Sequence, residues 1–247
     1  MKEVYLAYFD FMGFKEFIQN NDDVVLMRRM GHIFRDIEIC LGQGKYQEPR
    51  NGVIVADVSR SKLNCLNISD TVIVWTNDCD LDSLKELINV AYEFNWREIG
   101  YNFPLRGAIL KGKIREVTGR QVNSEGGSYS VQCVYGKGIV DAHLKAESQN
   151  WAGTVIDQSI IDDLTIFDQI DFISEMTTKY EVPYKTENSE EYVFKIIKTP
   201  LNDTALANVL KDIDRVFSMD NKSIERESVR LKIENTKKFI IDTKDEE

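Results

Sequence analysis

The segment that most constrains the fold of this chain is residues 4–17, VYLAYFDFMGFKEF. Its first half alternates as an extended run, and both sides of that run are apolar: Val4, Leu6 and Tyr8 on one, Tyr5, Ala7 and Phe9 on the other. A strand that is apolar on both faces is typical of the centre of a sheet, where other elements cover both sides. The sequence therefore predicts a central, buried strand that ends at Asp10.

Asp10 and the residues after it form the first candidate site. A carboxylate at the end of a buried strand needs a partner or a metal ion, because an unpaired buried charge is costly. Phe11, Met12 and Gly13 follow, and residues 14–18 begin a helix. Gly13 lets a ligand approach the backbone, and the free N–H groups of a helix start attract anions. We expect a metal ion and a phosphate to be held together here; the alternative is that Asp10 only caps the helix.

Composition limits the classes of partner. The 247 residues are 43% hydrophobic and carry a formal net charge of −10, which argues against general binding to nucleic acid or to an anionic membrane. We expect no membrane span, because no apolar run approaches the required length, and no signal peptide, because the chain enters its first strand at once. The four cysteines are scattered without a CxxC pair, which indicates reduced thiols and a cytoplasmic location. His32 and His143 are too few for a zinc site or a serine-type triad.

Hydrophobic periodicity in the rest of the chain predicts a mixed α/β (α+β) fold with helices flanking one sheet. We expect helices over residues 20–41, 81–96, 136–149, 160–164, 206–217 and 223–241, and extended segments over 54–75, 105–112, 131–135, 151–156 and 192–197. Residues 118–129 read as a glycine- and serine-bearing connection, and 168–188 as irregular. In the helix at 136–149 the expected inner positions are Ile139, Val140, His143 and Leu144.

A second carboxylate, Asp70, lies in a predicted hairpin. The run NISD precedes a β-branched segment, Val72 to Val74, so Asp70 falls near the turn beside a buried strand. On its own, Asp70 is more typical of an ordinary turn residue. After the strand at 105–112, Lys111, Lys113 and Arg115 form a local basic cluster, which we interpret as a solvated strand end or as a phosphate contact.

Three blocks of sequence together resemble the catalytic domain of class III nucleotidyl cyclases. They are residues 10–14 (DFMGF), residues 68–72 (ISDTV), and a third block made of 106–109 (RGAI), 134–140 (VYGKGIV) and 149–153 (QNWAG). The chain is most similar to the small bacterial members typified by the Pycsar pyrimidine cyclases of phage defence. The resemblance covers residues 4–200, so we expect a cyclase-like domain at 1–200 and a C-terminal helical extension, 201–247, packed on the same domain.

The resemblance implies a two-metal site and a homodimer. In that family two aspartates on adjacent strands hold two divalent ions, Mn²⁺ or Mg²⁺, and the matching residues here are Asp10 and Asp70, with the backbone carbonyl of Phe11. The ions activate the ribose 3′-hydroxyl for attack on the α-phosphate, which expels pyrophosphate. The backbone of Met12, Gly13 and Phe14 is expected to receive the β- and γ-phosphates. The resemblance also implies that each site is completed by a second copy of the chain.

The departures from the family pattern point to a different base. The residues that read a purine in adenylyl and guanylyl cyclases are replaced here by Leu66 and Cys133, which lack the hydrogen-bonding groups for adenine or guanine. We therefore expect a pyrimidine substrate, UTP or CTP, with Tyr46 or Tyr135 as possible stacking partners. A purine cyclase whose base readers have moved is a third, less favoured hypothesis.

The transition-state residues also depart from the pattern. Val140 and Leu144 stand where the family carries an asparagine and an arginine, so Lys145, Arg106 or Lys111 must substitute, or the site is impaired. The prediction is a uridylate or cytidylate cyclase, a phosphorus–oxygen lyase that makes a second messenger in antiviral defence. The alternative is a cyclase-like protein that binds a nucleotide or a partner without turnover.

Overall fold

Strand β1 (Lys2–Phe11) lies in the middle of the sheet, as its two apolar faces predict. The computed structural model describes residues 1–49, 51–52 and 54–245. β1 pairs antiparallel with β3 (Thr71–Trp75) on one side and with β4 (Leu105–Val122) on the other. Every residue from position 4 to position 9 is buried, so this strand forms the axis of the hydrophobic core.

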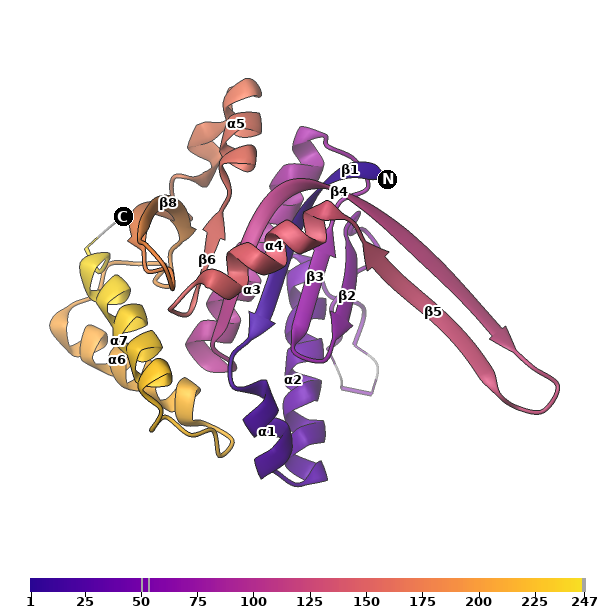
Figure 1. Cartoon of the computed structure of the whole chain (residues 1–247), viewed down its shortest axis with the longest axis horizontal. Coiled ribbons are helices and arrows are strands. Elements are labelled where there is room, and N and C mark those ends of the chain that lie inside the picture. Colours follow the sequence, from indigo (N-terminus) through magenta and orange to yellow (C-terminus); the bar gives the residue numbers. More distant parts are fainter. Residues whose placement is uncertain (50, 53, 246–247) are drawn as a thin grey trace.

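The sheet is mixed, which confirms the predicted fold class. The strand order is β2-β3-β1-β4-β6-β8-β7, and β5 pairs with the outer half of β4 (Figure 1). The β4–β6 pair is parallel and the remaining pairs of the described sheet are antiparallel. The other strands are β2 (Asn64–Ile68), β5 (Ser128–Tyr135), β6 (Gly153–Ile156), β7 (Thr177–Val182) and β8 (Ser189–Phe194).

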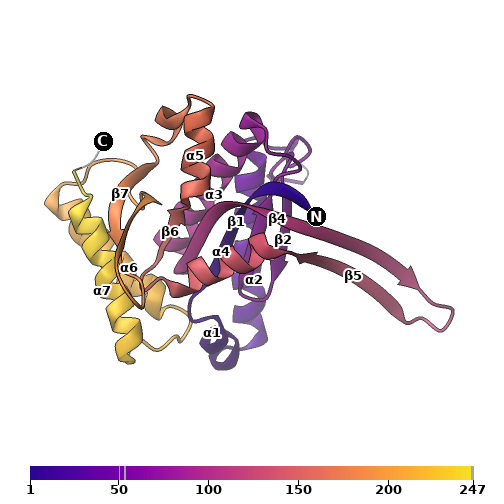
Figure 2. The same ribbon diagram turned by 45° about the horizontal axis from the view of Figure 1, so that its top comes forward.

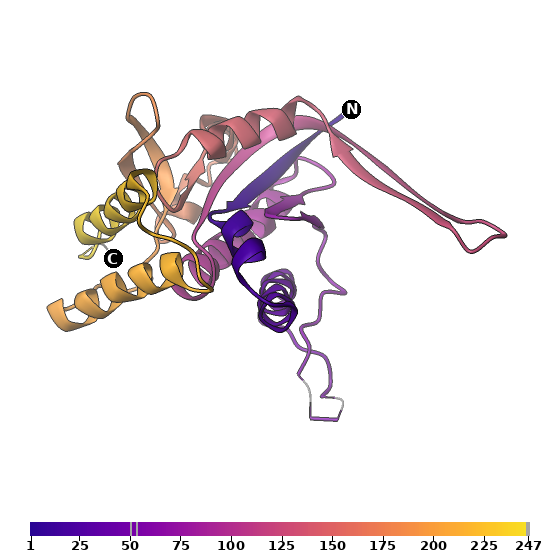
Figure 3. The same cartoon turned by 60° about the horizontal axis from the view of Figure 1, so that its bottom comes forward.

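Helices cover both faces of the sheet. α2 (Asp23–Gly42) and α3 (Leu81–Tyr101) pack on one face, and α4 (Lys137–Ser148) crosses the other (Figure 3). The short α1 (Phe14–Asn20) follows β1 directly, and α5 (Gln158–Ile166) follows β6. Within the described part of the chain, no helix has both the length and the apolar character needed to cross a membrane.

The face of α4 that meets the sheet is not the predicted one. Its buried residues are the small ones, Gly138, Ala142 and Ala146, whereas Val140 and Leu144 are more than half exposed. The reason is close approach: a Cβ added to Gly112 of β4 would lie only 2.6 Å from the Cα of Gly138. A helix this close to a strand must present small side chains inward, so Val140 and Leu144 turn outward, whereas Ile139, also predicted to face inward, is partly buried and packs against the core.

Two other segments differ from the sequence prediction. Residues 118–129 are not a loose connection; β4 and β5 continue as a two-stranded ribbon that projects from the body (Figure 2) and turns at residues 123–127. Residues 168–188 contain a 3₁₀ helix, Ile170–Ile173, and the edge strand β7. The ribbon and β7 have solvent on one or both faces, so their sequences lack the apolar alternation that marks a buried strand.

Two C-terminal helices, α6 (Asp203–Ser218) and α7 (Glu227–Asp242), complete the structure. α6 packs on α3, and α7 packs on α6. Asn202 caps α6 by accepting a hydrogen bond from the Ala205 amide. The rings of Trp151, Tyr180 and Phe239 contact one another and join α7 to the sheet. Both predicted helices therefore exist, while the domain boundary at residue 200 stays a prediction.

The loop between α6 and α7 returns to the beginning of the chain. Asn21 Nδ2 donates to the carbonyl of Asp220 (2.6 Å), and Asn20 Nδ2 donates to the carbonyl of Asn221 (2.9 Å). Arg29 Nε and Asp220 Oδ2 form a buried ion pair at 2.7 Å, although their geometry is not that of a hydrogen bond. The junction of α1 and α2 is therefore joined to a segment about two hundred residues later in the sequence.

Candidate active site

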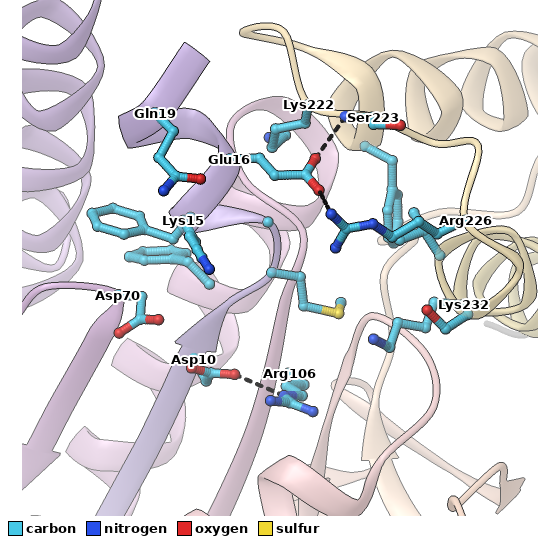
Figure 4. Close-up of a pocket in the computed structure, with 17 residues that line it drawn as sticks. Asp10, Lys15, Glu16, Gln19, Asp70, Arg106, Lys222, Ser223, Arg226 and Lys232 are labelled. Atoms are coloured by element: carbon cyan, nitrogen blue, oxygen red, sulfur yellow. Dashed lines mark hydrogen bonds and ion pairs between the residues drawn. The ribbon is translucent and has the colours of Figure 1, made fainter. Parts of the chain in front are cut away.

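Asp10 and Asp70 come together at one end of β1. Asp10 stands opposite Thr71 of β3 and Arg106 of β4, and Asp70 occupies the tight turn between β2 and β3. The Phe11 amide donates to the carbonyl of Asp70 (2.8 Å), which fixes the turn against the end of β1. Figure 4 shows both carboxylates beside the same cavity. The residues thus lie as neighbours, as the two-metal hypothesis requires.

Arg106 is the immediate partner of Asp10. Its Nε donates to Asp10 Oδ2 at 2.7 Å, and its Nη1 donates to the carbonyl of Glu147 at 2.7 Å (Figure 4). Burial raises the pKa of Asp10; the Arg106 guanidinium opposes that rise, and the nearby Asp70 carboxylate adds to it. A carboxyl group whose pKa is perturbed by burial and by a like charge is typical of a functional site.

The cavity has a volume of about 410 Å³, within the range of small-molecule sites. Five basic side chains and three acidic ones line it, although the chain as a whole is strongly acidic. The basic residues are Lys15, Arg106, Lys222, Arg226 and Lys232. Three of these five come from the α6–α7 loop and from α7, so the C-terminal helices form one wall of the cavity.

The predicted phosphate segment, Phe11 to Phe14, lines the cavity. Gly13 adopts a left-handed conformation (φ 79°), and a Cβ at this position would lie 2.9 Å from Cδ of Lys222. A side chain is therefore excluded by conformation and by space. The Met12 amide already donates to the carbonyl of Pro104 (2.8 Å), so it is not free to receive a phosphate. Among the described residues, no side chain caps the start of α1.

Other predicted residues lie away from this cavity. Leu66 is buried on β2, and Cys133 is exposed on the ribbon opposite Val117. Neither one lines the cavity in this chain, and Tyr46 and Tyr135 do not line it either.

Two of the three predicted substitute cations are engaged elsewhere. Lys145 Nζ bridges Asp157 (2.8 Å) and Glu191 (2.6 Å), and Lys111 Nζ pairs with Asp163 (2.8 Å). Both charges are already neutralised by carboxylates outside the cavity, and neither residue lines the cavity of its own chain. Arg106 is the one that the structure places in the cavity.

Four basic residues of the cavity were not predicted from the sequence: Lys15, Lys222, Arg226 and Lys232. Lys15 follows the predicted phosphate segment directly, and Figure 4 shows its amine directed toward the two aspartates. Its position after Phe14 was a usable signal. The other three lie in a charged C-terminal stretch with no motif, and they reach the site through tertiary packing alone.

The oxygen donors at the end of β1 fit a divalent ion that is bound partly by the protein and partly by the substrate. The described residues contain no group of three or more histidine, cysteine or acidic side chains able to hold a metal. Mg²⁺ is commonly bound through one or two carboxylates plus phosphate oxygens and water, and does not need an all-protein cage. Asp10, Asp70 and the Phe11 carbonyl would therefore hold such an ion when a triphosphate occupies the cavity.

Comparison with known proteins shows the fold. No family model matches the sequence, and no curated protein sequence matches it. The guanylate cyclase domain of RhGC from Catenaria anguillulae, solved with GTP, superposes with a TM-score of 0.51 at 12% identity, over 78% of this chain and 96% of that one. A dimeric guanylyl cyclase domain of RhoGC from Blastocladiella emersonii gives the same values.

A third similar structure is the catalytic core of a rhodopsin-guanylyl cyclase with converted specificity, in complex with ATPαS. Its TM-score is 0.51 at 11% identity, over 78% of this chain and 95% of that one. The chain therefore has the fold of class III nucleotidyl cyclase catalytic domains.

Proposed function

We propose that this protein is a nucleotide cyclase that converts UTP or CTP to the 3′,5′-cyclic monophosphate and pyrophosphate. The observation that carries the proposal is the convergence of Asp10 and Asp70 at the end of β1, beside a cavity lined by basic side chains. Asp10 lies near the end of β1, and Asp70 directly precedes β3, the strand that pairs with β1, so the two carboxylates come from adjacent strands of a cyclase fold. Fold alone does not define chemistry, whereas the side chains of a site do.

Each residue of the sheet side has a distinct task in this mechanism. Two divalent ions, Mg²⁺ or Mn²⁺, lower the pKa of the ribose 3′-hydroxyl and neutralise phosphate charge when bound. Asp10 and Asp70 would hold the ions together with the Phe11 carbonyl. Arg106 orients Asp10 through its 2.7 Å hydrogen bond and leaves Oδ1 of that carboxylate available as a ligand. Gly13, in its left-handed conformation, makes the turn that leads from β1 into α1 beside the cavity.

The pyrimidine preference rests on the apolar character of two positions. Leu66 and Cys133 replace the polar pair that reads a purine in the resembling family, and neither forms the required hydrogen bonds. A site built to hydrogen-bond a base discriminates far more strongly than an apolar site does. The antiviral role and the cytoplasmic location belong to the same proposal: the first rests on the resemblance to Pycsar cyclases, and the second on four free thiols.

The proposed active unit is a homodimer. Val140 and Leu144 of α4 are 54% and 56% exposed, and Ile68 and Tyr135 are exposed as well. These apolar side chains suit contact with a second copy, through which Leu66 and Cys133 would reach the partner's cavity. Light scattering should give the mass of a dimer, and Leu144→Asp should shift it to that of a monomer. Ile166→Asp, at an exposed position of α5, is the matched control. An active monomer at assay concentration would contradict the dimer.

One experiment tests the reaction itself. The protein is incubated with each of the four ribonucleoside triphosphates and manganese, and the products are identified by mass. Cyclic UMP or cyclic CMP should dominate. Cyclic AMP or cyclic GMP as the main product would overturn the pyrimidine assignment but keep the cyclase.

A second candidate function is nucleotide binding without turnover. Arg106 already neutralises part of the charge on Asp10, and apolar residues occupy the positions of the transition-state pair. Nucleotide bound tightly with no cyclic product from any triphosphate would favour this candidate.

A further inference from the structure

The C-terminal wall of the cavity has a different electrostatic character from the rest of the site. It is formed by the α6–α7 loop and the first turns of α7, and its charged residues are Lys222, Arg226 and Lys232 (Figure 4). Glu16 of α1 accepts hydrogen bonds from the Ser223 amide (2.8 Å) and pairs with Arg226 Nη2 (3.0 Å). The wall is thus attached to the element that follows β1, and Arg226 is partly neutralised by that attachment.

Lys232 is the cation of this wall that is aimed at the reactive end of the site. It is half-buried, and Figure 4 shows its amine extending toward Arg106 and Asp10. Within the described part of the chain the Lys232 amine forms no hydrogen bond and no ion pair, although the backbone carbonyl of this residue accepts from Thr236 Oγ1. Burial lowers the pKa of Lys232; Arg106 and Lys185 lower it further, while Asp10 raises it. An unpaired ammonium group near a guanidinium is unfavourable until an anion enters between them.

Lys222 adds a second unpaired cation to the same wall. Lys222 is only 6% exposed, and its Nζ forms no hydrogen bond with the described residues. The ammonium group lies 4.0 Å from the centroid of the Phe103 ring, and its stem packs on Gly13. Buried cations are normally paired, so a buried lysine left without a partner beside a cavity points to an anionic ligand.

We infer that the α6–α7 loop and α7 form the polyphosphate-binding wall of the active site, and that Lys232 contacts the triphosphate in the same chain as Asp10. This inference rests on the proposed function and specifies how its substrate is held. In this arrangement Lys232 also supplies a cation to the site. Val140 and Leu144 cannot provide one, and Lys145 and Lys111 are already paired with carboxylates outside the cavity. The triphosphate would then lie between the metal-binding carboxylates on the sheet and a basic wall on the C-terminal helices.

The test compares three substitutions in the full-length chain. Lys232→Ala removes the charge, Lys232→Arg keeps it, and Lys238→Ala removes an exposed charge on the same helix as a matched control. The probe is inorganic tripolyphosphate with Mg²⁺, and its dissociation constant is measured by calorimetry. Loss of one charge-assisted hydrogen bond should weaken binding about 10- to 100-fold in Lys232→Ala. The arginine variant should retain most of the affinity, and the Lys238 variant all of it; thermal melting checks that all three variants are folded.

The same variants, assayed for cyclic nucleotide, separate this inference from the proposed function. If the wild type makes product and Lys232→Ala changes neither tripolyphosphate affinity nor KM, the inference is overturned and the cyclase stands. If no triphosphate gives product but Lys232→Ala still weakens tripolyphosphate binding, the cyclase is overturned and the basic wall stands. A wild type that binds no tripolyphosphate would overturn the inference directly.

Discussion

The two sides of the cavity differ in how their charges are arranged. On the sheet side, Asp10 is paired with Arg106 at 2.7 Å. On the helix side, the ammonium groups of Lys222 and Lys232 form no hydrogen bond and no ion pair with the described residues, and that of Lys222 lies over the face of the Phe103 ring. A paired charge contributes to the fold whether or not a ligand is present, whereas an unpaired buried charge costs stability until a ligand neutralises it. The charges on the sheet side therefore stabilise the fold even without a ligand. The unpaired charges on the helix side lower the stability of the free protein, and a bound ligand would remove that loss.

The largest expected effect is loss of activity on the sheet side. Asp10→Asn or Asp70→Asn removes one metal-binding charge while keeping the shape of the side chain. We expect either change to reduce cyclic nucleotide formation by about 10³-fold or more, because metal and electrostatic stabilisation of phosphoryl transfer is lost. Product is quantified by mass spectrometry at saturating Mn²⁺, and thermal melting checks the fold.

The matched control for these two variants is Asp168→Asn. Asp168 is exposed and has a positive φ of 55°, which asparagine also tolerates. Near-full activity in Asp10→Asn or Asp70→Asn would show that the two aspartates have a structural role only. The sheet side and the helix side of the cavity would then no longer differ in function.

The next largest effect is a gain of stability on the helix side. Lys222 lies near Asp220, Arg29 and Glu98, and burial is the main cause that lowers its pKa from 10.5 to about 8. Lys222→Met keeps the packed stem and removes the charge, so it should raise the free energy of unfolding at pH 7 by on the order of 3 kcal/mol. Urea unfolding measures this, and a destabilised variant would show that the ammonium group is paired.

The difference in unfolding free energy between Lys222→Met and the wild type should depend on pH with a definite sign. Between about pH 8 and 10.5 the unfolded wild type binds more protons at Lys222 than the folded wild type does, so wild-type stability rises with pH through that window. The methionine variant lacks this contribution. Its advantage should therefore be greatest below pH 8 and should shrink as the pH approaches 10.5.

A smaller effect is expected when the pair on the sheet side is broken. Arg106→Ala leaves a largely buried Asp10 carboxylate without its partner and should cost about 1–3 kcal/mol of unfolding free energy. Adding Asp10→Asn to Arg106→Ala should recover part of that loss, because the uncompensated charge is gone. A double-mutant cycle by urea unfolding measures the coupling. Strictly additive losses would mean that Arg106 acts through its bond to Glu147 and not through Asp10.

The smallest effect concerns a lysine outside the cavity. Lys145 bridges Asp157 and Glu191, so Lys145→Met should lower the unfolding free energy by about 1 kcal/mol. Its affinity for tripolyphosphate should match that of the wild type, in contrast to Lys232→Ala. Equal losses of affinity in the two variants would show that the wall is not specific to the C-terminal helices.

The sheet side was predictable because its residues follow from local patterns. The two apolar faces of β1 placed that strand at the centre, and the hairpin pattern placed Asp70 beside a turn; that Asp10 and Asp70 lie on adjacent strands was implied by the resemblance to class III cyclases. The ribbon and β7 were missed because solvent on their faces removes the alternation that marks a strand. The inner face of α4 was misassigned because a helix lying against Gly112 must present glycine and alanine, which carry little periodic signal.

The helix side was not predictable from any local pattern. Lys222 and Lys232 reach the cavity only because the α6–α7 loop binds the junction of α1 and α2, and nothing near those lysines in the sequence indicates that contact. Lys145 and Lys111 lie close to the family motif in the sequence, yet neither lines the cavity of its own chain. Their ion pairs involve residues from distant strands and helices, which sequence spacing does not show.

The contact between Glu16 and Ser223 spans 207 positions of the chain, and this separation sets an order of events during synthesis. Contacts between distant positions form late, because the intervening chain must first be made and the loop closed. The central strand and its neighbours emerge from the ribosome and can pair well before residue 223 exists. During synthesis, Asp10 and Asp70 are therefore in place first. Lys222 and Lys232 complete the cavity only after α7 has been made and has packed on the rest of the chain.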